Sequence, residues 1–579
     1  MKDSRKIILV MLSIMGLISL LVGSIAYYRI VVNGSIKGST GNAVFVLRDS
    51  DNSVWNNKVI DLGKINPGDC GEFTVIMDAS GSTVDMYATL EIERTNLPTN
   101  LKFYTTSDHK SELHKYYSFL ERSGTNSETL TIYWYWNPYI SDEEDNKFIN
   151  VSNLEANIRV SAVQISEYAM MKNGHSSSSS ANGGTEFWNN TYKPYIRTIN
   201  FGSDLSNLPS SCTEENLCWD ISYSTSQKKK VYGYLIDSGL TVSETDSSTS
   251  TTTEKALYNL YIVSEAPIFA PINCDYIFDN FKNLVQINFN NNFNTSLVSF
   301  MNSMFRDCSS LIKLDLSNFN TSKVIYMDGM FLGCSSLASL NLSNFNTSKV
   351  INMSYMFQNC SFLENLDLSS FNTLNVTTMY FMFLGCSSLV SLDLSNFNTS
   401  KVTKMNSMFM NCSSLTTLVL SSFNTSYVVD MSSMFHNCSS LENLDLSSFN
   451  TLNVTTMYYM FSDCSSLVSL DLSNFNTSKV TKMDSMFMNC SSLTSLNLSN
   501  FNTSKVTSVY SMFSGCAKLQ TEINIMNTVK YYSGMFYNAL SDSAAYVILG
   551  YTTDTQSIAE AMKATASTAN QSKITLKAI

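Results

Sequence analysis

The stretch CSSLVSLDLSNFNTSKVTKMNSMFMN at residues 386–411 is one copy of a unit that recurs along the second half of the chain. A fixed period of this length is typical of proteins in which each copy is one structural unit that stacks on the next. The pattern predicts a repetitive stack over residues 277–540, with atypical copies at its two ends. The cysteine that begins the unit recurs every 26 residues, at Cys308, Cys334, Cys360, Cys386, Cys412, Cys438, Cys464, Cys490 and Cys516.

The first half of each copy has the alternation of a β-strand. Leu389, Leu392 and Leu394 form the pattern L-x-x-L-x-L, which is typical of a leucine-rich repeat. Because successive side chains of a strand point to opposite faces, Leu392 and Leu394 are expected to point inward, while Ser391 and Asp393 point outward.

The second half of each copy has a different period. Its apolar residues, from Val402 through Met405 and Met408 to Cys412, follow steps that place them on one face of a helical segment. Thr399 or Ser400 stands where an N-cap would begin that helix. The predicted fold class is therefore mainly β with short helices: a leucine-rich-repeat solenoid of strand-turn-helix units, preceded by an antiparallel β-sandwich.

Three ladders of identical residues are expected along the stack. The methionine and phenylalanine rows are predicted to form the core. Equivalent cysteines would lie ~4.8 Å apart with parallel side chains, which is too far for the Cβ separation of a disulfide, so free buried thiols are favoured over disulfides or metal ligands. Asn320, Asn346 and Asn398 are expected to stack and satisfy turn backbone groups, although they also form N-x-S glycosylation sequons.

The outward positions of the predicted strands form a candidate binding surface. We expect a concave, acidic face rich in hydroxyl and amide groups, able to hydrogen-bond to a glycan or to a basic protein surface. The alternative interpretation is a merely solvated face. The candidate ligand-binding residues are Asp315, Asp367, Asp393, Asp445, Asp471, Asn365 and Asn443.

The N-terminus predicts export. Lys2, Arg5 and Lys6 precede the uncharged segment Ile7–Tyr28, so residues 1–30 are predicted to be a signal peptide or a signal anchor. Positive charge on its N-terminal side places the rest of the chain outside the cytoplasm. The sequence leaves open whether the segment is removed after Ala26 or retained in the membrane.

Four further segments are expected. Short alternating β-branched and aromatic runs predict a β-sandwich over residues 31–167. A Ser/Gly-rich linker is predicted at 168–190, a β-rich lead-in that caps the stack at 191–276, and a strand-helix-strand cap at 541–579. Cys212 and Cys218, in the lead-in, are predicted either to form a disulfide or to remain free thiols.

Composition argues against catalysis and against nucleic acid as a partner. Charged residues are 15% of the chain, the net charge is −11 and no long basic run is present. The four histidines are scattered, and no phosphate loop, nucleophile elbow or zinc motif occurs. We therefore expect a protein that is not an enzyme and holds no cofactor and no metal.

The repeat LDLSNFNTSKVTKMNSMFMNCSSL, over about 280–537, resembles the repeat of BspA-type leucine-rich-repeat surface proteins. That resemblance implies adhesion to host, matrix or bacterial surface ligands, and it carries over no functional residue. The segment DLGKINPGDCGEFTV and the WYW strand resemble TasA/camelysin-type matrix subunits, which implies self-assembly through strand exchange. The expected function is thus an extracellular adhesin; the alternative is a structural component of a biofilm matrix that polymerises through its β-sandwich.

Overall fold

The computed structural model describes residues 29–32, 36–37, 44–48, 60–63, 69–80, 85–93, 97–98, 101–104, 115–120, 127–136, 154–165, 169–172 and 191–579, the last without 225, 226, 228, 247, 249 and 499. Residues 1–28 of the predicted signal segment and residues 173–190 of the predicted linker lie outside these ranges. Within them, no helix has the length and apolar character needed to cross a membrane. The chain divides into two compact units, Met1–Tyr168 and Ala169–Ile579.

The first unit contains two antiparallel sheets. One has the strand order β1-β10-β6-β8, with β4 also paired to β10; the other has the order β2-β3-β5-β9-β7. Burial alternates along β9, where Leu130, Ile132, Trp134 and Trp136 are buried, so that sheet has one apolar face, as antiparallel sheets commonly do. The strands are β1 (Arg29–Val32), β2 (Ile36–Lys37), β3 (Val44–Arg48), β4 (Ile60–Gly63), β5 (Cys70–Asp78), β6 (Asp85–Glu93), β7 (Leu101–Tyr104), β8 (Lys115–Leu120), β9 (Ser127–Trp136) and β10 (Leu154–Ile165).

The second unit begins inside the segment that the sequence assigned to a linker. Strand β11 (Ala169–Met170) pairs in parallel with β16 (Ile268–Phe269), which pairs with β18 (Phe293–Asn294). Ala169 and Met171 are buried in the same core as the repeats. Residues 169–171 are therefore part of the folded unit, because their apolar side chains complete its first layer.

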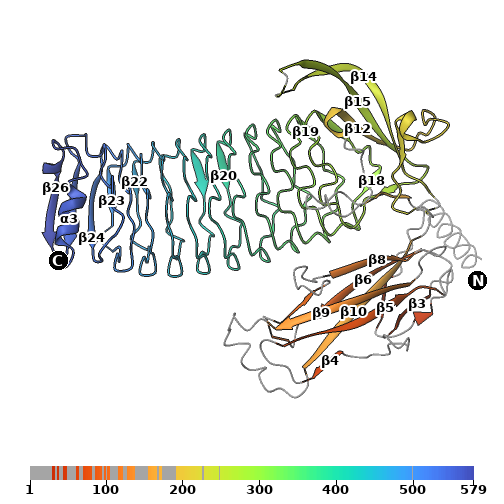
Figure 1. The fold of residues 1–579 in the computed structure, drawn as a ribbon, viewed down its shortest axis with the longest axis horizontal. Helices are drawn as coiled ribbons and strands as arrows, with labels where there is room; N and C mark the ends of the chain where they lie inside the picture. The colour runs from red at the N-terminus through yellow and green to blue at the C-terminus, as the bar shows by residue number, and fades with distance from the viewer. Residues whose placement is uncertain are drawn as a thin grey trace, which may run out of the picture. The chain divides into compact units, whose positions relative to one another are not determined.

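A six-stranded sheet leads into the repeats. Its order is β13-β14-β15-β12-β17-β19, and β12, β17 and β19 run parallel to one another. Strands β14 and β15 form a long antiparallel ribbon that extends away from the repeats (Figure 1). The strands are β12 (Ile196–Gly202), β13 (Cys218–Asp220), β14 (Tyr232–Thr245), β15 (Thr252–Val263), β17 (Gln286–Asn288) and β19 (Lys313–Leu314), and the short 3-10 helices η1 (Lys193–Tyr195) and η2 (Glu214–Asn216) lie beside them.

The repeats lie side by side as successive coils, here called the repeat stack (residues 277–540; Figure 1). On one side of each coil, short parallel strands pair at the repeat distance, as in Leu392 with Leu418. On the other side a ladder of single parallel bridges joins one residue of each coil to the next, from Asn273 to Tyr531. The strands of the first side include β20 (Ser391–Asp393), β21 (Thr417–Val419), β22 (Ser469–Leu470), β23 (Ser495–Asn497) and β24 (Gln520–Ile525).

The prediction of a short helix in each repeat is wrong. Residues 406–411 and their equivalents form consecutive turns, and Ser407 and Asn411 have φ of 54° and 62°, which a right-handed helix does not contain. The backbone N–H of Phe409 donates to the carbonyl of Met434 in the next coil at 3.0 Å, and the N–H of Cys412 donates to Phe409 at 3.2 Å. Half of these donors thus bond between coils, where a helix would keep all of them within one segment.

The expected N-cap residue has a different role. The Thr399 hydroxyl donates to the carbonyl of Asn424 in the next coil at 2.9 Å and accepts the N–H of the same residue at 2.7 Å. Thr399 is buried, and its equivalents from Thr295 to Thr477 repeat this pair of bonds. Asn398 satisfies a turn backbone group, as predicted, but within its own coil: its exposed side chain accepts the backbone N–H and the hydroxyl of Ser400. Threonine therefore forms the ladder between coils.

One continuous core runs from Ala169 to Ile574. The core phenylalanines stack face to face, as Phe383, Phe409 and Phe435 do with ring centroids 5.7 and 5.6 Å apart. The strand-helix-strand prediction for the C-terminal segment is confirmed by β25 (Tyr546–Tyr551), α3 (Gln556–Lys563) and β26 (Ile574–Ala578), with the 3-10 helix η3 (Gln571–Lys573) before the last strand. Helix α3 is the one α-helix within the described residues, and strands dominate the fold.

Candidate functional site

The predicted binding residues lie on the strand side of the coils, in two adjacent outward rows that we call the strand face. Asp393 stands between Leu392 and Leu394, which are buried, and is itself exposed. Asn365 and Asn443 occupy the neighbouring row and are exposed as well. The structure thus brings all seven predicted residues to one face: Asp315, Asp367, Asp393, Asp445, Asp471, Asn365 and Asn443.

Each aspartate of the strand face also shapes the chain that follows it. Asp393 Oδ1 accepts the backbone N–H of Ser395 at 2.9 Å, and Asp367 accepts that of Ser369 at the same distance. These backbone hydrogen bonds hold the pKa of both carboxyl groups below their usual range. The carboxylates are therefore charged and fixed in direction. The same side-chain acceptor is supplied by an amide at Asn341, so the charge is not required for the turn.

The opposite side of the coils carries aromatic residues that the sequence analysis did not single out. We call it the turn face: the rows equivalent to Asn406 and Ser407, in which serines such as Ser407 are buried, together with the bridging row of Lys404. Tyr355, Tyr380 and Phe381 form a cluster there, with Tyr355 stacked on Phe381 at 5.2 Å. Tyr458 and Tyr459 form a second cluster with ring centroids 5.9 Å apart. These residues occupy the variable positions just before each Met-Phe pair, which is the signal that would have revealed them.

Two carboxyl groups of the turn face differ from those of the strand face. Burial raises the pKa of Asp275 to about 7 and that of Asp328 to about 6. Asp275 accepts the backbone N–H of Asn302 in the next coil at 2.7 Å, and Asn302 accepts that of Asp328 at 3.2 Å. The row therefore links consecutive coils through side chains that cover the backbone.

The cysteine ladder is built of free thiols, as predicted. Cys308 and its equivalents are buried and unpaired, and the Cys412 thiol donates to the carbonyl of Phe383 at 3.2 Å. Burial raises the pKa of Cys308 and Cys360 to about 12. Because only a thiolate is nucleophilic or binds metal, these side chains are chemically inert.

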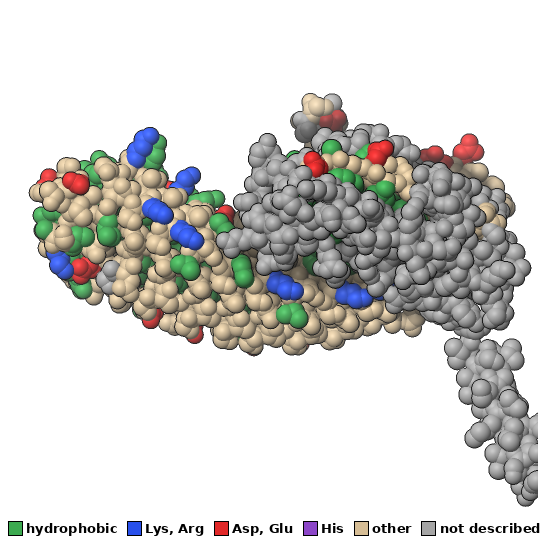
Figure 2. All heavy atoms as spheres, turned by 90° about the horizontal axis from the view of Figure 1, so that it is seen from below, with side chains coloured by type: hydrophobic (Ala, Val, Ile, Leu, Met, Phe, Trp, Pro, Cys, Tyr) green, Lys and Arg blue, Asp and Glu red, His purple; other side chains and the backbone are tan. Residues whose placement is uncertain are grey.

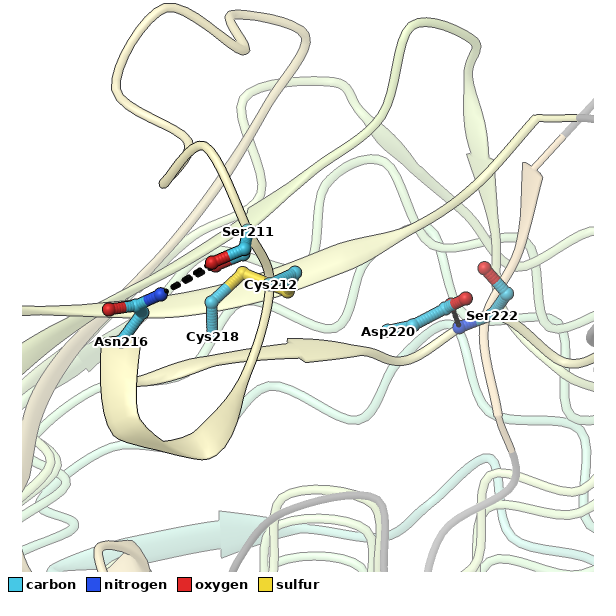
Figure 3. The surroundings of a disulfide bond; sticks show 6 residues. All are labelled: Ser211, Cys212, Asn216, Cys218, Asp220 and Ser222. Atoms are coloured by element: carbon cyan, nitrogen blue, oxygen red, sulfur yellow. Dashed lines mark hydrogen bonds between the residues drawn. A yellow bond between two sulfur atoms is a disulfide. The ribbon is translucent and has the colours of Figure 1, made fainter.

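Cys212 and Cys218 lie outside the ladder and form a disulfide, with Cα atoms 4.7 Å apart (Figure 3). The bridge closes a short loop that also contains η2. Asn216 in that loop donates to the hydroxyl and the carbonyl of Ser211, at 2.8 and 3.0 Å. The disulfide therefore stabilises the edge of the lead-in sheet next to β13.

Metal and charge clusters are sparse in the part of the chain that the structure describes. No group of three His, Cys, Asp or Glu side chains there is arranged to hold a metal ion. In Figure 2 the basic, acidic and hydrophobic side chains of the described residues stand apart from one another, and no large patch of one charge is visible on the described part of that face. Extended rows of outward side chains, on the strand face and on the turn face, are thus the candidate sites.

Comparison with known families decides the identity of the repeats. The family described as "Mycoplasma protein of unknown function, DUF285" matches three overlapping stretches, residues 272–392, 382–493 and 467–575, which together span more than half of the chain. The chain belongs to the DUF285 family. The DUF285 matches extend over the repeat stack and through β25 to the start of β26, so the C-terminal cap belongs to the same family segment.

Other comparisons add little to the DUF285 assignment. No curated protein is detectably similar to the chain. A crystal structure of a TLR13–ssRNA13 complex is similar over 54% of this chain and 53% of that chain, at 14% sequence identity and a TM-score of 0.19. The chain thus spans about half the length of that protein, and at this TM-score the likeness supports no assignment.

Proposed function

We propose that the protein is an exported adhesin, displayed on the cell surface or secreted, that holds an extracellular ligand on the strand face of its repeat stack. The DUF285 repeats and their resemblance to BspA-type leucine-rich-repeat surface proteins support a role in binding. A basic segment, Lys2–Lys6, followed by the uncharged segment Ile7–Tyr28, supports export. The protein acts by binding and carries out no reaction.

The observation that carries this proposal is the fixed, exposed row of carboxylates. Asp367 and Asp393 lie in adjacent coils, ~4.8 Å apart along the stack, and Asp445 and Asp471 repeat the pair three coils further on. Each uses Oδ1 for the backbone N–H of the serine two residues further on. Preorganised acceptors of this kind bind donor-rich partners with little loss of side-chain entropy.

The ligand expected from this chemistry is a protein surface rich in lysine or arginine. Asn365 and Asn443 flank the carboxylates and add amide donors and acceptors. Complementary charge would raise the association rate and make binding sensitive to salt.

The test is a binding measurement with the second unit alone, residues 169–579, against arrays of extracellular-matrix proteins, glycans and bacterial surface material. Replacing Asp367, Asp393, Asp445 and Asp471 by asparagine removes the charge and keeps the turn, since Asn341 already occupies this row with the same bond. Saturable binding that is lost in this variant, with an unchanged melting temperature, is the expected result. Binding that survives the four substitutions would rule out the strand face as the site.

The alternative of a matrix component makes a different prediction. If the first unit polymerises, residues 27–579 assemble as concentration rises, and residues 169–579 do not. A chain that remains monomeric at high concentration would remove the main support for that role. Sedimentation of the two chains side by side distinguishes the alternatives.

A further inference from the structure

The turn face carries the same aromatic and basic group twice. Tyr380, Phe381 and Lys404 have equivalents three coils later, 78 residues along the sequence, at Tyr458, Tyr459 and Lys482. At ~4.8 Å per coil the two groups are separated by ~14 Å. We call them patch one (Tyr380, Phe381, Lys404) and patch two (Tyr458, Tyr459, Lys482).

Each patch combines ring faces with an ammonium group. In patch one the rings of Tyr380 and Phe381 meet edge to face at 5.5 Å, and Lys404 Nζ lies 5.9 Å from the centre of the Tyr380 ring. In patch two Tyr458 and Tyr459 meet edge to face at 5.9 Å. Tyr458 is 38% exposed, and both lysines are exposed. Edge-to-face pairing at this distance stabilises the rings against each other, and Tyr380, Phe381 and Tyr459 are partly exposed.

The coil itself does not require aromatic residues at these positions. The equivalents of Tyr380 in the next two coils are Asn406 and Ser432, and those coils stack with the same backbone bonds. The core below is already filled by Phe383 and Phe461, which are fully buried. The core therefore does not require the aromatic pairs, which pack instead on neighbouring rings of the same face: Tyr355 stacks on Phe381 at 5.2 Å, and His436 meets Tyr459 edge to face at 5.9 Å.

Backbone conformation supplies a second, independent observation. Phe381 and Tyr459 have φ of 59° and 55°, in the left-handed region that is costly for bulky side chains. The next coils place serine at this position, as at Ser407 and Ser433. Strained residues cluster at functional sites, and Phe381 and Tyr459 combine this backbone conformation with a bulky aromatic side chain.

We propose that the two patches together bind a linear, anionic polysaccharide with a repeating unit. The apolar face of a sugar ring packs on an aromatic ring, while an ammonium group pairs with the carboxylate of an acidic sugar. Because the patches are related by translation along the stack, a ligand that occupies both must repeat along its own length. A globular protein lacks that repeat, whereas a sugar polymer has it.

Single-stranded nucleic acid is the other polymer that combines stacking with negative charge. Its charge density requires many basic groups along the groove, and each patch has one lysine on a chain of net charge −11. A sparsely charged polymer fits the patches better. The proposal concerns the turn face alone and does not depend on the strand face.

The test measures binding of residues 27–579 to long hyaluronan chains, short hyaluronan oligosaccharides, neutral dextran and oligodeoxythymidylate. Because two linked sites act in concert, the long chain is expected to bind at least about tenfold more tightly than the short one. Replacing Phe381 and Tyr459 by serine is expected to abolish that gain while leaving the melting temperature unchanged or higher, since serine is the residue of the neighbouring coils. A role in stability alone would lower the melting temperature instead.

Controls separate this proposal from the one on the strand face. Phe362→Ala removes an exposed aromatic residue outside the patches and should leave hyaluronan binding intact, as should the four asparagine substitutions of the strand face. Replacing the aromatic residue of patch one alone, by Phe381→Ser, should lower the affinity for long hyaluronan to the affinity for short oligosaccharides. Unchanged binding in the serine variant, equal binding of dextran, or preferential binding of oligodeoxythymidylate would each overturn the proposal.

Discussion

The two sides of the repeat stack hold aspartates in opposite electrostatic states. On the strand face, Asp367 is exposed and its pKa is lowered by a backbone N–H. On the turn face, burial raises the pKa of Asp275 to about 7 and that of Asp328 to about 6. The strand side points its polar side chains into solvent, whereas the turn side folds them over its own backbone. The same residue type is therefore a candidate ligand group on one side and a structural group on the other.

The two sides also differ in how they satisfy their backbone. The strand side pairs whole short strands, such as β20 and β21, in one register. The turn side alternates, so that Ser407 and Phe409 bond to the next coil while Met410 and Cys412 bond within their own. Both sides converge on the same continuous core, and the first prediction tests how much of the stability each side contributes.

The largest expected effect comes from emptying the core on the turn side. Phe409→Ala removes a fully buried ring that stacks on Phe383 and Phe435, and it should cost about 3–5 kcal/mol of unfolding free energy. Leu394→Ala, the strand-side counterpart, should cost about 2–5 kcal/mol. Urea unfolding of residues 169–579, monitored by circular dichroism, gives both values. A loss under 1 kcal/mol for Phe409 would show that the turn side packs loosely, unlike the strand side.

The sequence predicted the strand side well because its signal is local. Alternation places Leu392 and Leu394 inside and Asp393 outside, and a strand needs nothing more to set these directions. All seven predicted binding residues reached one face for that reason. The inert thiols also followed from geometry, since parallel side chains cannot approach closely enough to bond.

The turn side escaped prediction because its hydrogen bonds join residues 25 positions apart. The spacing of Met405, Met408, Phe409 and Cys412 fits a helix and fits a series of turns that bury the same side. The residue before each repeat cysteine, always Asn, Asp or Gly, was the missing signal, because these types tolerate positive φ. The aromatic patches lie at variable positions of the repeat, so the repeat pattern alone does not predict them.

The second prediction concerns pH and follows from the contrast between the aspartates. A buried carboxyl with a raised pKa stays protonated when the unfolded form has ionised, so the folded state loses stability as pH rises from about 4 to about 7. The strand-face carboxyl groups have a lowered pKa, so they become protonated only as pH falls below about 4. Their contribution to stability is lost there, and stability falls again. The melting temperature of residues 169–579 should therefore be highest at about pH 4 and fall as pH rises to about 7.

Substitution of Asp275 and Asp328 measures how much these two carboxyl groups contribute to the pH dependence of stability. Asp275→Asn together with Asp328→Asn should stabilise the protein at pH 8 by on the order of 2 kcal/mol and have little effect at pH 4. The matched control, Asp367→Asn with Asp393→Asn, should leave the slope between pH 5 and 8 unchanged. A double variant of Asp275 and Asp328 that keeps the original slope would show that other groups set the pH dependence.

The smallest expected effect distinguishes a turn from a helix directly. The two conformations predict opposite signs for the difference in stability between an alanine and a glycine variant at Asn411. Asn411 has φ of 62° and accepts a hydrogen bond from the Asn437 side chain at 3.2 Å. Alanine and glycine both remove that bond, so the difference between the two variants reports the backbone alone. In a helix, alanine would be more stable than glycine by about 1 kcal/mol; in the left-handed turn, glycine should be more stable than alanine by about 1 kcal/mol.

The strand side provides the matched pair. Ser391 is exposed on β20, where alanine should be more stable than glycine by about 0.5–1 kcal/mol because glycine loses more backbone entropy on folding. Opposite orders at Asn411 and Ser391, measured by urea unfolding, are the expected outcome. The same order at both positions would mean that the two sides of the coil share one kind of backbone, and the distinction between a strand side and a left-handed turn side would fail.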